Sequence, residues 1–124
     1  MNKVVMNTAI IGLGEVAQEH LSIWRKIDDI RVAAVCDSDK PRAEKTARVW
    51  GIPTYSDNLG EILQEQPISI VDICTPPQAH CSLILQALEA GCHVIVEKPL
   101  TMTTEEARTI ISRKKTGKVM APTR

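Results

Sequence analysis

Apolar residues along the chain fall into short, continuous runs that are separated by amphipathic, helix-type patterns. The runs are apolar at successive positions instead of at every second one, which is typical of strands whose sheet is covered on both faces. They predict strands at Thr8–Gly12, Ile30–Cys36, within Gly51–Asp57, at Ile68–Cys74 and at His93–Glu97, with residues 118–121 ("KVMA") as the beginning of a sixth.

Helix-type segments lie between these strands. They predict helices at Glu15–Ile27, from Asp39 to Trp50, at Leu59–Gln64, from "TPPQAH" to Ala90, and from Thr103 to Lys115. Strict alternation of strand and helix implies parallel strands that are joined by right-handed crossovers. The pattern therefore predicts an α/β fold, a doubly wound parallel sheet in three αβα layers, as a single domain over residues 1–124.

Composition and charge mainly argue against certain classes of binding partner. Fifteen basic residues balance fifteen acidic ones, and the few aromatic residues are Trp24, Trp50 and Tyr55, so nothing favours binding to nucleic acid or to an anionic membrane. Asn7 and Thr8 interrupt the first apolar run, no cleavage motif follows it, and no apolar stretch reaches membrane-spanning length. We therefore expect a cytoplasmic protein.

Cysteine and histidine residues are the natural candidates for metal ligands. The four cysteines include no C-x-x-C pair, so we expect free thiols. We also expect no metal, because no standard zinc spacing is found among Cys74, His80, Cys81, Cys92 and His93. His20 follows the apolar face of its helix beside Leu21 and Trp24, which predicts a histidine packed in the core.

A glycine-rich turn, "GLGEVA", follows the first predicted strand and opens the first predicted helix. Gly12 permits a tight turn, Gly14 lets a pyrophosphate approach the backbone, and Ala17 lets the helix pack close to the sheet. The free N–H groups of the first helical turn would face the anion. We therefore predict cofactor contacts along the turn, at Gly12, Leu13, Gly14, Glu15 and Val16.

An acidic residue stands at the expected distance from this turn. Asp37 lies twenty residues past Ala17, at the end of the second predicted strand, where a carboxylate would accept hydrogen bonds from an adenosine ribose. A negative charge there favours NAD over NADP, although the nearby Lys40 and Arg42 keep NADP open. The alternative is a ligand-free turn with a solvated Asp37.

Two further strand ends carry polar or proline-rich sequence, Thr75-Pro76-Pro77 and Glu97-Lys98-Pro99. In an open α/β sheet, ligands lie outside the carboxyl ends of the strands. The nicotinamide half of a dinucleotide should therefore extend over these two ends, with Lys98 near the reacting carbon. An ammonium group there could polarise an oxygen or exchange a proton. The alternative is a solvated lysine with no chemical role.

The stretches "AIIGLGEVAQEHL", "VAAVCDSD", "VDICTPPQAH" and "AGCHVIVEKPLTMTTEEA" together resemble the nucleotide-binding half of the glucose–fructose oxidoreductase / inositol dehydrogenase / MocA family of NAD(P)-dependent oxidoreductases. The resemblance covers almost the whole chain and implies a Rossmann fold. It implies that Lys98 contacts substrate and assists proton transfer, and that Pro99 follows a cis bond. It also places six residues in the cofactor cleft: Thr75, Pro76, Pro77, His80, Glu97 and Lys98. For His80, the alternative is a hydrogen bond to the backbone at its helix start.

The family carries a second, substrate-binding domain that this sequence does not contain. The resemblance therefore implies the NAD(P)-binding domain of an oxidoreductase acting on a sugar, cyclitol or related polyol, without turnover on its own. Apolar surface left uncovered would favour self-association. Two alternatives stay open: a stand-alone NAD-binding sensor module, and a Rossmann fold for another adenosine ligand such as an acyl-CoA.

Overall fold

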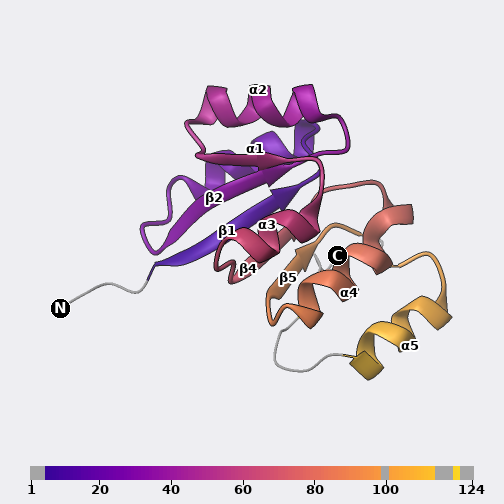
Figure 1. Cartoon of the computed structure of the whole chain (residues 1–124). Helices are drawn as coiled ribbons and strands as arrows, with labels where there is room; N and C mark the ends of the chain where they lie inside the picture. The colour runs from indigo at the N-terminus through magenta and orange to yellow at the C-terminus, as the bar shows by residue number, and fades with distance from the viewer. Residues whose placement is uncertain (1–4, 99–100, 114–118, 121–124) are drawn as a thin grey trace.

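Six parallel strands form one sheet in the order β3-β2-β1-β4-β5-β6 (Figure 1). The computed structural model describes residues 5–98, 101–113 and 119–120. The strands are β1 (Met6–Ile11), β2 (Ile30–Cys36), β3 (Thr54–Ser56), β4 (Ile70–Ile73), β5 (His93–Val96) and β6 (Val119–Met120). This order reverses between β1 and β4, which confirms the predicted doubly wound sheet.

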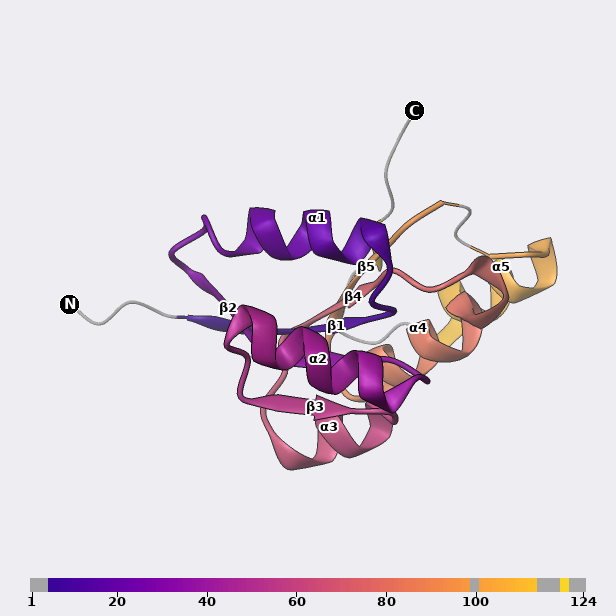
Figure 2. The ribbon, with the colours of Figure 1, turned by 90° about the horizontal axis from the view of Figure 1, so that it is seen from above.

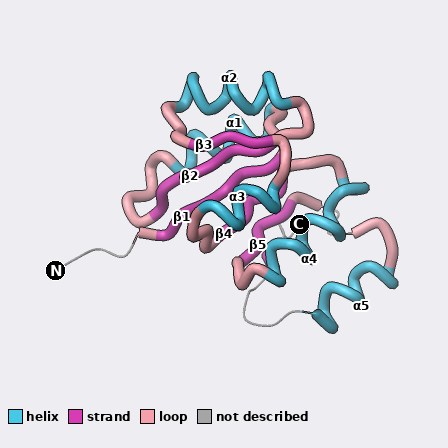
Figure 3. Tube along the Cα trace, viewed as in Figure 1, coloured by secondary structure: helices cyan, strands magenta, loops and turns pink. Residues whose placement is uncertain are grey.

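Helices cover both faces of the sheet (Figure 3). They are α1 (Glu15–Trp24), α2 (Lys40–Trp50), α3 (Leu59–Glu65), α4 (His80–Glu89) and α5 (Thr104–Arg113), with a short 3₁₀ turn, η1 (Pro77–Ala79), before α4. Residues of α1 and α2 share one apolar cluster, and residues of α3, α4 and α5 share the other. Figure 2 shows α1 and α3 on opposite sides of the sheet.

The strand β1 contributes side chains to both apolar clusters. Ile10 packs with α1 and α2, while Ala9 and Ile11 pack on the opposite face with α3 and α4. All of these are buried, so the run is apolar throughout because neither face of the strand meets water.

Local capping fixes where the helices begin and end. The Asp39 side chain accepts the Arg42 N–H at 3.2 Å at the start of α2, and Gly51, with a left-handed φ of 68°, caps its end. At the start of α5, Thr103 accepts the Glu106 N–H at 3.1 Å, as a capping box predicts.

The first helix differs from its prediction. It ends at Trp24, not at Ile27, and the apolar residues Val16 and Ile27 are 40% and 39% exposed. The helix buries Ala17 and Leu21, and Ile27 follows in a turn that the helix does not reach.

Two expectations fall partly or wholly outside the described residues: the cis bond before Pro99 and the helix end at Lys114 and Lys115. Over the part of the chain that is described, no helix has the length and apolar character needed to cross a lipid bilayer.

Candidate functional site

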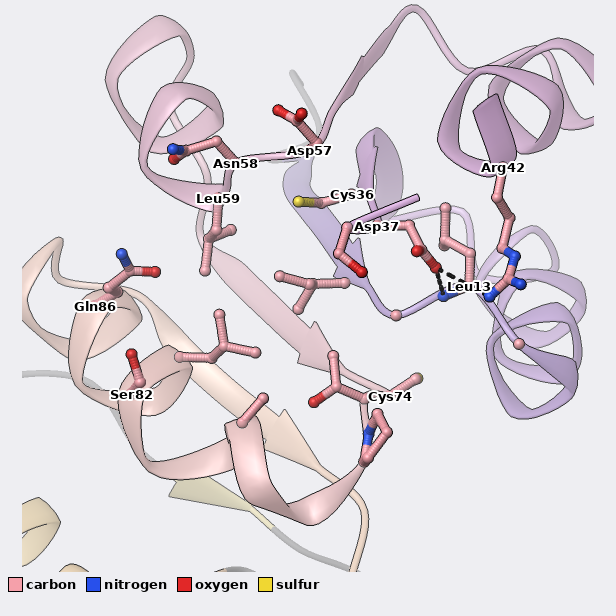
Figure 4. Close-up of a pocket in the computed structure, with 18 residues that line it drawn as sticks. Leu13, Cys36, Asp37, Arg42, Asp57, Asn58, Leu59, Cys74, Ser82 and Gln86 are labelled. Atoms are coloured by element: carbon pink, nitrogen blue, oxygen red, sulfur yellow. Dashed lines mark hydrogen bonds and ion pairs between the residues drawn. The ribbon is translucent and has the colours of Figure 1, made fainter. Parts of the chain in front are cut away.

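A cavity of about 870 Å³ opens at the carboxyl ends of β1, β2 and β4, the edge where the strand order reverses (Figure 4). This volume lies within the range of small-molecule and cofactor sites. Its wall brings together six of the predicted residues: Gly12, Leu13, Gly14, Asp37, Thr75 and Pro76. The fold therefore assembles the glycine turn, the acidic residue and the end of β4 around one space.

The two glycines of the turn meet different surroundings. Gly12 has a left-handed φ of +89°, and a Cβ atom there would lie 2.7 Å from both the Cys74 carbonyl carbon and the Thr75 nitrogen. At Gly14 a Cβ atom would have no heavy atom within 4 Å beyond its chain neighbours. The first glycine is therefore required by the packing of β1 against β4, whereas the second leaves open space beside the cavity.

Asp37 fastens the glycine turn to the end of β2. It is only 6% exposed. Its Oδ2 accepts the Leu13 N–H at 2.9 Å, and its Oδ1 accepts the Asp39 N–H at 2.8 Å. The Arg42 guanidinium lies 3.7 Å from Oδ2, on the cavity wall (Figure 4). A carboxylate and a cation thus stand side by side where the ribose was predicted.

The far part of the cavity was missed from the sequence. It is lined by the β3–α3 connection and by the first turns of α4, through Asp57, Asn58, Leu59, Ser82 and Gln86 (Figure 4). The position of β3 could have indicated this part of the cavity, because β3 ends at the same sheet edge as β1 and β2. These residues add amide and hydroxyl groups beside an apolar side chain, which suits a ring with polar edges.

Thr75 supplies a test of whether a ligand fits. It lines the cavity, and among the described residues its buried Oγ1 has no hydrogen-bond partner. A buried hydroxyl without a partner is uncommon. Together with the open space beside Gly14 and the Asp37 carboxylate on the same wall, this buried hydroxyl makes the residues present fit a dinucleotide.

The remaining predicted residues do not line the cavity. Glu15 and Val16 are exposed in the first turn of α1, and Pro77 begins η1. His80 is fully buried at the start of α4, contrary to its expected place on the cleft wall. Its Nε2 lies 2.9 Å from the Thr75 carbonyl oxygen, so the backbone-bonding alternative describes its position.

Glu97 and Lys98 follow β5 and also lie off the cavity wall. The Glu97 N–H donates to the Ile73 carbonyl at 3.4 Å, which keeps the ends of β4 and β5 together. The Lys98 side chain is exposed. Both residues therefore stand at the carboxyl edge of the sheet, next to β4 and beyond the cavity lining.

His20 is not the core residue that the sequence predicts, but a bridge between two carboxylates. Its Nδ1 lies 2.8 Å from Asp72 Oδ2 and its Nε2 lies 3.1 Å from Glu97 Oε1, with the side chain 21% exposed. The Asp72 hydrogen bond raises the pKa of His20 most, burial opposes it, and the negative charges of Asp72 and Glu97 add to the rise.

Asp72 is fully buried inside β4, where an unpaired carboxylate would be costly. It accepts the Trp24 Nε1–H at 2.8 Å and a 3.6 Å contact from the Cys74 thiol, in addition to His20. Ligand atoms of His20, Asp72 and Cys74 lie within 4.8 Å of one another. Hydrogen bonds among these groups account for the cluster, and burial raises the pKa of the Cys74 thiol, so we assign no metal to it.

No disulfide joins the four cysteines, in agreement with the prediction. Cys36 lines the cavity, but burial, followed by the charges of Asp37, Asp57 and Glu61, raises the pKa of its thiol to about 12. A thiol that stays protonated is a poor nucleophile, so Cys36 contributes apolar wall and no covalent chemistry.

Comparison with known proteins identifies a family and two similar dehydrogenases. The family described as "Oxidoreductase family, NAD-binding Rossmann fold" matches residues 6–122. D-Glucoside 3-dehydrogenase of Escherichia coli (strain K12) is 38% identical over 123 residues, which are 98% of this chain and 35% of that protein. The scyllo-inositol 2-dehydrogenase (NAD(+)) of Bacillus subtilis (strain 168) is 35% identical over 111 residues, which are 88% of this chain and 32% of that protein.

A solved structure shows the same fold. The scyllo-inositol dehydrogenase from Lactobacillus casei, with bound cofactor NAD(H) and scyllo-inositol, superposes with a TM-score of 0.85 at 24% identity, covering 94% of this chain and 36% of that one. This chain spans about a third of the length of the curated relatives it matches. Because the family match runs through nearly the whole chain, the protein belongs to the oxidoreductase family with an NAD-binding Rossmann fold.

Proposed function

We propose that the cavity at the carboxyl edge of the sheet holds NAD, and that the domain serves hydride transfer to or from a hydroxyl or carbonyl carbon of a sugar, cyclitol or related polyol. The observation that carries the proposal is the meeting of the glycine turn, Asp37 and Thr75 around one cavity. The names of two relatives, a glucoside dehydrogenase and an inositol dehydrogenase, support the substrate class.

The cofactor would lie across the strand ends. Its pyrophosphate would approach the open side of Gly14 and the first turn of α1, where helix N–H groups favour an anion. The adenosine ribose would lie beside Asp37, and the adenine toward Asn58 and Gln86. The nicotinamide would extend past Thr75 toward the end of β5.

Lys98 would act at that end. Bound NAD supplies the hydride acceptor, and an ammonium group beside the substrate oxygen can donate a hydrogen bond and exchange its proton. The place of Lys98 two residues after β5 and its exposed side chain support this role. Lys98 does not line the cavity, so it is not expected to contact the adenosine half of the cofactor.

Replacement of this lysine separates catalysis from cofactor binding. Lys98→Ala is expected to change NADH affinity less than about twofold, well under 1.4 kcal/mol, because Lys98 does not line the cavity. In any longer form of the protein that oxidises a polyol, the same change is expected to abolish turnover. Lys26→Ala, at an exposed lysine in the turn after α1, is the matched control. Retained turnover in Lys98→Ala would remove the lysine from the mechanism.

Cofactor choice gives a second test. Asp37→Asn removes the charge that a ribose 2′-phosphate would meet and leaves Asp39, at 3.9 Å, as the carboxylate that still pairs with Arg42. We expect the preference for NADH over NADPH to fall about tenfold, equal to ~1.4 kcal/mol, as measured by calorimetry with each cofactor. Asp57→Asn, at another carboxylate of the cavity wall, is the control. An unchanged ratio in Asp37→Asn would show that Asp37 does not select the cofactor.

A further inference from the structure

The cluster of His20, Asp72 and Glu97 joins three elements that each lead to the proposed site. His20 comes from α1, which starts at the glycine turn. Asp72 comes from β4, which runs into Cys74 and Thr75, and Glu97 follows β5 directly before Lys98. None of the three lines the cavity, so cofactor contact does not explain them.

Both imidazole nitrogens of His20 face carboxylate oxygens, at 2.8 Å to Asp72 and 3.1 Å to Glu97. A carboxylate can only accept, so each contact needs an N–H on the ring. The charged imidazolium has two N–H groups, whereas the neutral ring has one. Loss of the proton therefore deprives one of the two carboxylates of its hydrogen bond.

The two carboxylates differ in whether water could replace the lost hydrogen bond. Asp72 is fully buried and would have no water to replace the bond, whereas the Glu97 side chain is 36% exposed. The remaining proton is thus expected on Nδ1, which faces Asp72. Glu97 is the carboxylate that a neutral His20 would release into water.

We propose that His20 is a positioning residue that, while charged, holds Glu97 and hence Lys98 against α1 and β4, and that lets them go when it loses its proton. The inference rests on the proposed function, in which Lys98 contacts the substrate. It gives the domain a catalytic lysine whose position follows the charge of a residue on another element.

The surroundings of His20 agree with this role. The titratable groups that face its ring are Asp72 and Cys74 on β4 and its end, and Glu97 after β5, while Trp24 faces Asp72 from the same helix. The hydrogen bond to Asp72, together with the charge of Asp72 and the contact with Glu97, outweighs burial and raises the pKa of His20. The charged, bridging form therefore persists to higher pH than for an ordinary histidine, and the release is expected on the alkaline side.

Nuclear magnetic resonance on the labelled 124-residue chain tests the inference without any cofactor. We expect the signals of the Glu97 side-chain carboxyl and the Lys98 amide to follow the titration of the His20 ring, whose midpoint lies above that of an ordinary histidine. Glu97→Gln should lower the His20 midpoint, because the Glu97 contact is one of the causes that raise it. His20→Asn should remove the shared step from Lys98.

Two outcomes would overturn the inference: a Lys98 amide that ignores the His20 titration in the unmodified chain, or the same step persisting in His20→Asn. The unmodified chain and the substitution at half-exposed Glu97 keep the test decisive if His20→Asn fails to fold. A parallel titration with NADH separates the two proposals. Coupled titration without NADH binding would sink the proposed function alone, whereas NADH binding without coupling would sink the positioning role alone.

Discussion

Gly14→Val is expected to abolish NADH binding while the chain remains folded. The backbone at Gly14 has a φ of −81°, which any residue adopts, and a Cβ atom there meets no neighbouring heavy atom within 4 Å. The valine methyl groups would instead occupy the space that the pyrophosphate needs. We expect affinity to fall about 100-fold or more, equal to ~2.7 kcal/mol, as measured by calorimetry.

The other glycines provide controls for this effect. Gly51→Asn, at the left-handed end of α2 and away from the cavity wall, should keep both fold and NADH affinity. Gly12→Ala should instead fail through loss of the fold, because its new Cβ would collide with the backbone at Cys74 and Thr75. Unchanged NADH affinity in folded Gly14→Val would contradict the placement of the pyrophosphate.

Asp72→Asn is expected to cause the largest loss of stability outside the glycine turn. The carboxylate is fully buried and accepts hydrogen bonds from His20 and Trp24 on one oxygen and a contact from Cys74 on the other. An amide removes the negative charge that pairs with His20, and its NH2 group replaces one of the two acceptor oxygens that face His20, Trp24 and Cys74. Breaking a buried pair in this way costs about 3–5 kcal/mol, which denaturant unfolding would measure.

The pH dependence of this loss has a definite sign. The pKa of His20 is raised in the folded state, so its charged interaction stabilises the fold below the pKa of an unfolded histidine and is lost as pH rises through the folded value. The difference between the parent chain and Asp72→Asn should therefore shrink over that alkaline range. Exposed Asp57→Asn should change stability by less than about 0.5 kcal/mol. Equal effects of the two substitutions would show that the cluster does not stabilise the fold.

Much of the fold could be predicted from the spacing of apolar, glycine and helix-capping residues along the chain. Apolar runs without alternation predicted strands buried on both faces, and the cap at Asp39 and the left-handed Gly51 confirmed the bounds of α2. The motif also predicted that Asp37 and the glycine turn serve one site, although the hydrogen bond from the Leu13 N–H to Asp37 that joins them was not predicted. Each of these features depends on residues that are close in sequence or on the single helix that connects β1 to β2.

The features that could not be predicted depend on how one element is rotated against another. His20 and Asp72 are 52 residues apart, and only the packing of α1 on β4 brings them to 2.8 Å. The charged residue inside the apolar run "IVDI" was the available signal for Asp72. The expected place of His80 on the cleft wall also depended on how an element is rotated. The start of α4 turns its ring inward, toward the Thr75 carbonyl.

The most direct measurement is a titration of the chain with NADH, followed by energy transfer from Trp24 and Trp50 to the reduced nicotinamide and checked by calorimetry. Saturable binding with one site per chain, weakened by Gly14→Val and tighter for NADH than for NADPH, is the expected result. A folded chain that binds neither cofactor would contradict the assignment of the cavity as a nicotinamide dinucleotide site.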